Sequence, residues 1–168
     1  DFCLSRGLGD VYKRQGLGDY GLNRAQLADP AAGPYLVFLH GTTWASKHWP
    51  EAYWRELAEQ VAEQGWSIRL PWGNEAEKAR AERIAAGVEG AAVLPKLNLA
   101  GVAKVLAGAQ ACVAVDTGLG HLAAALDVPT VSLYGPTLPG RVGAYGRSQV
   151  HPVSYTHLRA TRQAEISY

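Results

Sequence analysis

The chain alternates between two hydrophobic patterns along most of its length. Apolar runs occur at 35–39, 91–94 and 112–115, and strands are also expected at 66–70 and 129–134, where apolar and polar residues are mixed. Segments whose apolar residues recur every three or four positions separate these five stretches. Such runs are typical of strands covered on both faces, whereas the longer repeat is typical of amphipathic helices. Strand and helix alternating about five times predict an α/β fold with a parallel, right-handed, doubly wound sheet.

Local signals place the ends of the helices. Pro50 suits a first helical position, and Gly65 ends the repeat that follows it. Asn98 is a good N-cap, and Gly108 closes the helix that it begins. Together with the hydrophobic repeats, these signals predict helices over 50–65, 75–86, 98–108 and 117–127.

The segment 113–127 has the features of an anion site. Its strand ends at Asp116, and the next helix begins at Thr117, which is predicted to be the N-cap. Gly118 and Gly120 lie in the first helical turn, where they let a ligand approach backbone N–H groups that carry partial positive charge. Helical winding of about 100° per residue places His121 opposite the apolar stripe, so we expect it to face a cleft or solvent.

Further polar residues follow the other strands. Thr42, Thr43 and Lys47 offer two hydroxyl groups and a cation, a set that suits a diphosphate, and Glu77 is placed to accept hydrogen bonds from ribose hydroxyls. Purely structural interpretations of the same residues remain open. The threonines would then fill a turn and Lys47 would be a solvated charge. Glu77 would interact favourably with the helix dipole, and Asp116 would cap its helix. Ligands of doubly wound sheets bind at the carboxyl ends of the strands, which is where all these residues are expected.

Composition limits the function classes. The 168 residues suit one domain, and a net charge of +1 gives no reason to expect nucleic acid as a partner. Cys3 and Cys112 are far apart in the sequence, which favours a reducing compartment without a disulfide framework. The five histidines show no metal-ligand spacing, so we predict no metal. No apolar run reaches membrane-spanning length, and the amino terminus lacks a signal-peptide core.

Both ends differ from the middle of the chain. Residues 1–32 are rich in glycine and lack a period, which predicts a flexible lead-in before a domain at 33–150. The pattern Gly16-x-Gly18-x-x-Gly21 matches a dinucleotide-binding fingerprint, but no strand precedes it, so we interpret the match as chance. Residues 3–15 and those from 153 onward resemble translated sequencing-adaptor reads, and we predict that 151–168 is a non-native tail.

Seven motifs together resemble the carboxyl-terminal half of the lipopolysaccharide heptosyltransferases, members of glycosyltransferase family 9. They are His40-Gly-Thr-Thr43, Lys47-His-Trp-Pro-Glu51, Leu70-Pro-Trp-Gly73, Val93-Leu-Pro-Lys96, Gly101-Val-Ala-Lys-Val-Leu-Ala-Gly108, Val115-Asp-Thr-Gly-Leu-Gly-His-Leu122 and Leu133-Tyr-Gly-Pro-Thr137. The resemblance extends from about Gly18 to Val150. The double threonine before Lys-His-Trp-Pro favours the type I branch, with the type II branch as the alternative.

The resemblance implies a GT-B enzyme with two Rossmann-like halves, the second of which binds ADP-L-glycero-D-manno-heptose. By motif position, Thr42, Thr43 and Lys47 would hold the diphosphate, Glu77 the ribose and the backbone near Leu97 the adenine. Asp116, Thr117, Gly118 and His121 would hold the heptose and phosphates.

The resemblance also implies an activity: inverting, metal-independent transfer of heptose to Kdo of lipid A in the lipopolysaccharide inner core, without a cofactor. Such an enzyme works in the cytoplasm, in peripheral contact with the inner membrane. Its base and acceptor site lie in an amino-terminal half that this sequence does not match, and Asp10 and Asp19 are not assigned that role because no strand precedes them. We therefore expect this chain alone to bind the donor and transfer nothing. The alternative from another class is a non-catalytic nucleotide-binding module.

Overall fold

The computed structural model describes residues 20–29, 31, 33–135, 137, 140, 143, 144, 146 and 148–152. The predictions for the adaptor-like ends, for Asp10 and Asp19, and for Gly16 and Gly18 lie outside these residues.

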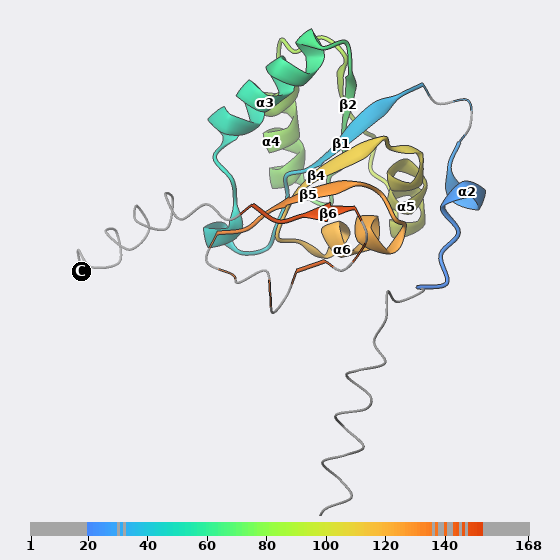
Figure 1. Ribbon diagram of the computed structural model, residues 1–168. Coiled ribbons are helices and arrows are strands. Elements are labelled where there is room, and N and C mark those ends of the chain that lie inside the picture. Colours follow the sequence, from blue (N-terminus) through green and yellow to red (C-terminus); the bar gives the residue numbers. More distant parts are fainter. Residues whose placement is uncertain are drawn as a thin grey trace, which may run out of the picture.

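Six parallel strands form one sheet in the order β3-β2-β1-β4-β5-β6 (Figure 1). They are β1 (Tyr35–Leu39), β2 (Ser67–Leu70), β3 (Ala91–Val93), β4 (Ala111–Val115), β5 (Thr130–Leu133) and β6 (Gln149–Val150). The predicted parallel, doubly wound sheet is confirmed. Strand β6 was not predicted, because a strand of two residues is too short to show a hydrophobic pattern.

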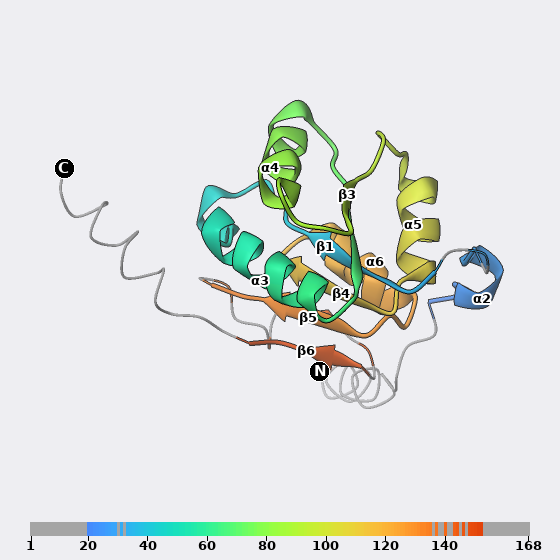
Figure 2. The same cartoon turned by 90° about the horizontal axis from the view of Figure 1, so that it is seen from above.

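Helices cover the sheet from both sides (Figures 1 and 2). Helices α3 (Glu51–Glu63) and α4 (Glu75–Ala85) contact β2 and β3, and α5 (Leu99–Gly108) and α6 (Gly118–Ala125) contact β1 and β4 from the other face. The predicted helices are all present, with ends shifted by one or two residues. In the described part of the chain, no helix has the length and apolar character needed to cross a membrane.

The hydrophobic core has two layers, one on each side of the sheet. Alternate residues of β1 supply both: Phe38 packs with Trp54 and Ile84 on the side of α3 and α4, and Val37 packs with Leu106 on the side of α5 and α6. All five side chains are completely buried. This two-sided burial explains why the central strands β1 and β4 are continuous apolar runs rather than alternating ones.

A short helix, α2 (Arg24–Leu27), packs against the domain within the segment predicted as lead-in. The Arg24 guanidinium donates hydrogen bonds to the carbonyl oxygens of Ala107 (2.9 Å) and Ala109 (2.5 Å), at the end of α5, and of Asp127 (3.2 Å), just after α6. A cation is favourable there, because helix carboxyl ends carry partial negative charge. A helix of four residues has no hydrophobic period, so the sequence pattern could not reveal it.

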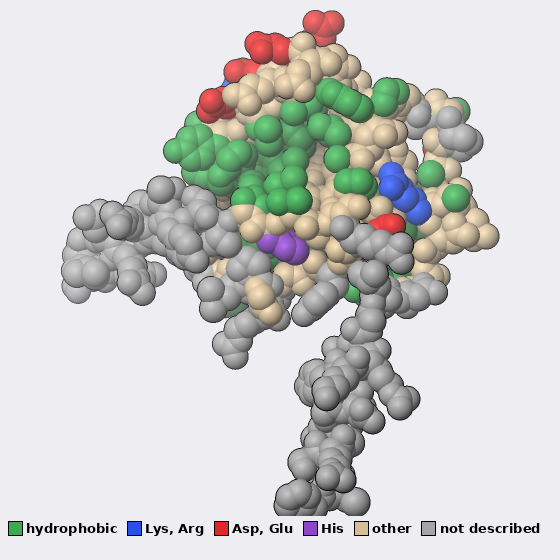
Figure 3. Space-filling model, viewed as in Figure 1, with side chains coloured by type: hydrophobic (Ala, Val, Ile, Leu, Met, Phe, Trp, Pro, Cys, Tyr) green, Lys and Arg blue, Asp and Glu red, His purple; other side chains and the backbone are tan. Residues whose placement is uncertain are grey.

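One half of one sheet face is only partly covered. Phe38, Val113, Val131 and Val150 are paired across β1, β4, β5 and β6, and their exposure rises along this row from complete burial to 37% at Val131 and 60% at Val150. Helices α5 and α6, which connect to β4 and β5, lie on the opposite face. Figure 3 shows hydrophobic side chains gathered between α3 and the strands β5 and β6.

Candidate functional site

The strand order reverses between β1 and β4, and the candidate site lies where these two strands end. From β1 the chain continues outward to β2 and β3, whereas from β4 it continues the other way to β5 and β6. Such a switch point leaves a crevice outside the carboxyl ends of the strands. The two loops there are joined by a hydrogen bond of 3.0 Å from the Thr42 hydroxyl to the carbonyl oxygen of Asp116.

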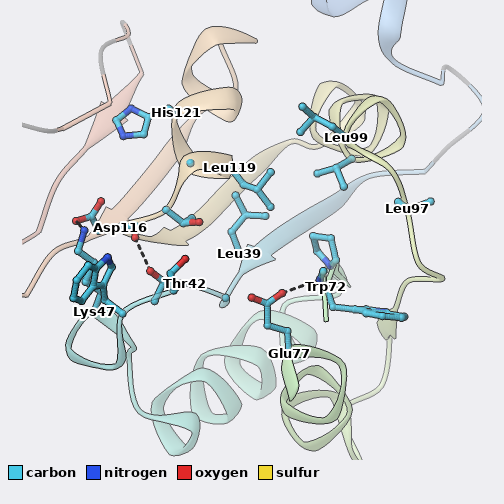
Figure 4. A pocket seen from close by; sticks show the side chains of 18 residues that line it. Leu39, Thr42, Lys47, Trp72, Glu77, Leu97, Leu99, Asp116, Leu119 and His121 are labelled. Atoms are coloured by element: carbon cyan, nitrogen blue, oxygen red, sulfur yellow. Dashed lines mark hydrogen bonds and ion pairs between the residues drawn. The ribbon is translucent and has the colours of Figure 1, made fainter. Parts of the chain in front are cut away.

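A cavity of about 440 Å³ opens at this switch point (Figure 4). Its volume falls within the range typical of small-molecule sites. All nine residues predicted from the sequence line it, although they come from four separate segments that follow β1, β2, β3 and β4: Thr42, Thr43, Lys47, Glu77, Leu97, Asp116, Thr117, Gly118 and His121. The structure thus brings the predicted residues together at one edge of the sheet, and the ligand group that each would contact remains a prediction.

One end of the cavity is charged. The 3-10 helix η1 (Ala45–Lys47) carries Lys47 to the end of β4, where its Nζ lies 2.8 Å from Oδ2 of Asp116. The lysine side chain is 26% exposed and the aspartate 9%. The sequence predicts a separate ligand contact for each residue, and it does not predict that they pair with each other. Figure 4 shows this pair beside Thr42, with His121 at the same end of the cavity.

The start of α6 matches the prediction only in part. Thr117 is the N-cap residue, as predicted, and has an extended backbone, although its side chain makes no capping hydrogen bond. Gly118 is open, because a Cβ built there meets nothing within 4 Å, and a ligand can approach its backbone. Gly120 instead packs against β4, where a Cβ would lie 3.4 Å from that of Ala114. His121 is exposed and lines the cavity, as its helical position predicted.

Glu77 lines the middle of the cavity, between the charged end and the opposite end. Asn74 caps α4 by accepting a hydrogen bond of 2.9 Å from the Glu77 N–H, and one carboxylate oxygen of Glu77 accepts a 2.7 Å bond from the Gly73 N–H. The carboxylate also lies against Gly41, where a built Cβ would be only 2.8 Å from its Cδ. Glu77 therefore sits in the favourable first turn and faces the cavity, so the two interpretations of its position are compatible.

The other end of the cavity is apolar. The Trp72 indole N–H donates a 2.6 Å hydrogen bond to the Leu94 carbonyl oxygen, which fixes the ring at the cavity wall, and Leu97 and Leu99 lie near it (Figure 4). The apolar repeat at 98–108 includes Leu99 and so predicts that it is buried. That prediction is wrong, because Leu99 is the first residue of α5 and is 67% exposed. Trp44, also on the cavity wall, was missed, because a single tryptophan in a loop shows no pattern.

His40 is a buried residue that the sequence analysis did not assign. It is 1% exposed at the end of β1, and neither ring nitrogen has a hydrogen-bond partner among the residues that the structure describes. Burial, and then the positive charge of Arg80, lower the pKa of His40 to about 4. The same causes lower the pKa of His48, whose Nδ1 lies 2.6 Å from Arg80. His40 is therefore neutral at physiological pH, directly before the loop that carries Thr42.

No group of three or more histidine, cysteine, aspartate or glutamate side chains could hold a metal ion in the part of the chain that the structure describes. The absence of a metal from the reaction remains a prediction.

Comparisons with known proteins agree with the motifs. The family model for glycosyltransferase family 9 (heptosyltransferase) matches residues 5–167. Lipopolysaccharide heptosyltransferase 1 of Pseudomonas aeruginosa is 76% identical over 138 residues, which make up 82% of this chain and 39% of that relative. This relative is a type I enzyme, which agrees with the branch favoured by the motifs.

Two solved structures have the same fold. The E. coli heptosyltransferase WaaC with ADP superposes with a TM-score of 0.80 at 44% identity, over 93% of this chain and 52% of that chain. WaaC with ADP-2-deoxy-2-fluoro heptose gives a TM-score of 0.77 at 43% identity, over 93% of this chain and 51% of that one. The chain thus spans between two fifths and about half of the length of these relatives. On the family match and these relatives, the chain belongs to glycosyltransferase family 9, the heptosyltransferases.

Proposed function

We propose that this chain is the donor-binding half of a type I lipopolysaccharide heptosyltransferase with two GT-B halves, and that its cavity binds ADP-L-glycero-D-manno-heptose. The observation that carries the proposal is the order of surfaces along the cavity. An apolar wall at Trp72 leads past the Glu77 carboxylate to the Lys47 cation and the start of α6. A nucleotide sugar presents a flat base, a ribose and a diphosphate in the same order.

Each part of the donor finds suitable chemistry in this arrangement. The adenine ring would lie along Trp72 and Leu97, because aromatic and aliphatic surfaces favour a flat, weakly polar base. The Glu77 carboxylate would accept hydrogen bonds from the ribose hydroxyls. Lys47, Thr42 and the first N–H groups of α6 would hold the diphosphate, since an ammonium group and a helix start both favour anions.

In the proposed reaction, a base removes a proton from a hydroxyl of the Kdo acceptor, and the resulting oxygen attacks the anomeric carbon of heptose. The bond between that carbon and the diphosphate oxygen breaks, and ADP leaves with the electron pair. The base and the acceptor site are proposed for the other half of the enzyme, at the cytoplasmic face of the inner membrane. The task of the present residues is to stabilise the negative charge that grows on the leaving diphosphate.

Calorimetry with the 168-residue chain tests the first part of the proposal. ADP should bind with micromolar or weaker affinity, on the order of 6 to 8 kcal/mol, because one wall of a two-sided cleft leaves the diphosphate exposed to water. The variant Thr42→Ala/Lys47→Ala should bind ADP much more weakly. Equal binding by the variant would contradict the assignment of the charged end.

An assay of ADP release with Kdo-lipid A as acceptor tests the second part. The chain alone should transfer no heptose, whereas a chimaera with the amino-terminal half of the Pseudomonas relative should do so. Transfer by the isolated chain would contradict the placement of the base in the other half. A chimaera that binds ADP and transfers nothing would favour a non-catalytic nucleotide-binding module.

Gly41→Ala should weaken ADP binding about tenfold with little change in the thermal unfolding midpoint. The added methyl group would come within 2.8 Å of the Glu77 carboxylate. The carboxylate can move away, but it then no longer accepts the proposed hydrogen bonds from the ribose hydroxyls. Calorimetry and thermal unfolding of the variant measure the two effects. Gly33→Ala is the matched control, because a Cβ there meets nothing within 4 Å. Unchanged ADP binding by Gly41→Ala would argue against the ribose contact.

A further inference from the structure

We infer that Asp116 competes with the diphosphate of the nucleotide for the Lys47 ammonium group, and thereby weakens the binding of ADP and promotes its release. This inference rests on the proposed function, because it concerns the same cavity and a nucleoside diphosphate as its ligand.

The geometry defines what a diphosphate meets when it enters. Lys47 is already paired, with 2.8 Å between its Nζ and Oδ2 of Asp116. The aspartate has little freedom to retreat: it directly follows β4, its side chain is 9% exposed, and its carbonyl oxygen accepts the Thr42 hydrogen bond. The lysine is more exposed and lies at the end of the short η1, so it is the partner that can turn toward a ligand.

The charges then decide the outcome. A diphosphate close enough to bind Lys47 also lies close to the Asp116 carboxylate, and like charges repel strongly where water is partly excluded. If Lys47 turns to the diphosphate, Asp116 remains a nearly buried carboxylate without its cation, which is unfavourable. If Lys47 stays with Asp116, the diphosphate gains less from its attraction to the Lys47 ammonium group. In both cases the carboxylate lowers the affinity for the diphosphate below that of an uncharged side chain at position 116.

The competition depends on the phosphate charge, so it should not affect the nucleoside alone. Adenosine would contact the apolar end and Glu77, which lie away from the Lys47–Asp116 pair (Figure 4). A comparison of ADP with adenosine therefore separates the competition from a general change in the shape of the cavity.

Calorimetry on the 168-residue chain tests the inference with five proteins at constant ionic strength: wild type, Asp116→Asn, Lys47→Ala, the double variant and Asp127→Asn. Asp116→Asn should bind ADP about three- to tenfold more tightly than wild type and adenosine equally well. The gain should be smaller in the Lys47→Ala background, where only repulsion is removed. Asp127→Asn is the matched control, since this exposed residue carries the same charge and does not line the cavity.

A second measurement uses the wild-type chain, so it does not depend on whether Asp116→Asn folds. In a spectrum of ¹⁵N-labelled lysine ammonium groups, Lys47, identified with Lys47→Ala, should give a slowly exchanging signal that shifts when ADP is added. The inference is overturned if Asp116→Asn binds ADP no more tightly than wild type, or if the Lys47 signal does not change with ADP. If none of the proteins binds ADP, the proposed function fails together with the inference. If wild type binds ADP and Asp116→Asn binds it no more tightly, only the inference fails.

Discussion

Lys47→Ala should lower kcat by about two to three orders of magnitude in the chimaera with the Pseudomonas amino-terminal half. The charge on the departing diphosphate grows as the bond to heptose breaks, so a fixed cation beside it stabilises the transition state more than the bound donor. Loss of a preorganised group that stabilises developing charge typically has an effect of about this size. Steady-state kinetics with ADP-heptose and Kdo-lipid A measure it.

Two further variants make this result specific. Lys104→Ala should keep the kcat of the parent, because this exposed lysine of α5 does not line the cavity. Asp116→Asn should change the KM for donor by a smaller factor than the one by which Lys47→Ala changes kcat. An unchanged kcat for Lys47→Ala would show that this lysine is a solvated charge.

Acidification from about pH 8 to about pH 5 should lower the free energy of unfolding by about 2 kcal/mol through His40 alone. The unfolded chain gains a proton near the ordinary histidine pKa of 6.5, whereas the folded chain resists protonation of His40 until about pH 4. Between these values the unfolded state binds more protons, so stability falls as the pH falls. The lowered pKa of His48 adds a smaller change in the same direction.

Urea unfolding of wild type and His40→Asn across this pH range measures the contribution. The variant should lose most of the pH dependence, because asparagine is polar and does not titrate. His121→Asn, which replaces an exposed histidine, should keep it. Acid titration of Glu51 does not confuse the result: Arg83 lowers the pKa of this carboxyl, so its protonation destabilises the fold only at lower pH. Parallel pH profiles for wild type and His40→Asn would contradict the prediction.

The local hydrophobic pattern was sufficient to predict the longer helices and strands, but it did not reveal the shortest ones. Helix α3 has thirteen residues, enough for several turns of apolar repeat, and its sequence prediction agrees with the structure. Helix α2 and strand β6 are held by long-range contacts instead, such as the Arg24 hydrogen bonds to residues more than eighty positions away. No local pattern contains that information.

The candidate site was predictable for a topological reason. The carboxyl ends of parallel strands meet at one edge, so polar residues after each strand had to converge, and the cavity wall contains them all. The contacts between individual residues of the cavity wall were not predictable. Whether Lys47 faces Asp116, or Glu77 faces Gly41, depends on side-chain directions that the spacing of residues in the sequence does not define.

The gradient of exposure from Phe38 to Val150 affects how any stability measured on this chain should be interpreted. Parallel sheets normally bury both faces, and here Val131 and Val150 leave apolar area in water. Each square ångström that a further segment covered would contribute about 25 cal/mol. The family relatives have more than twice as many residues as the part matched here. The free energy of unfolding of this chain is therefore a lower limit for the same domain within a longer polypeptide whose segments pack on that face.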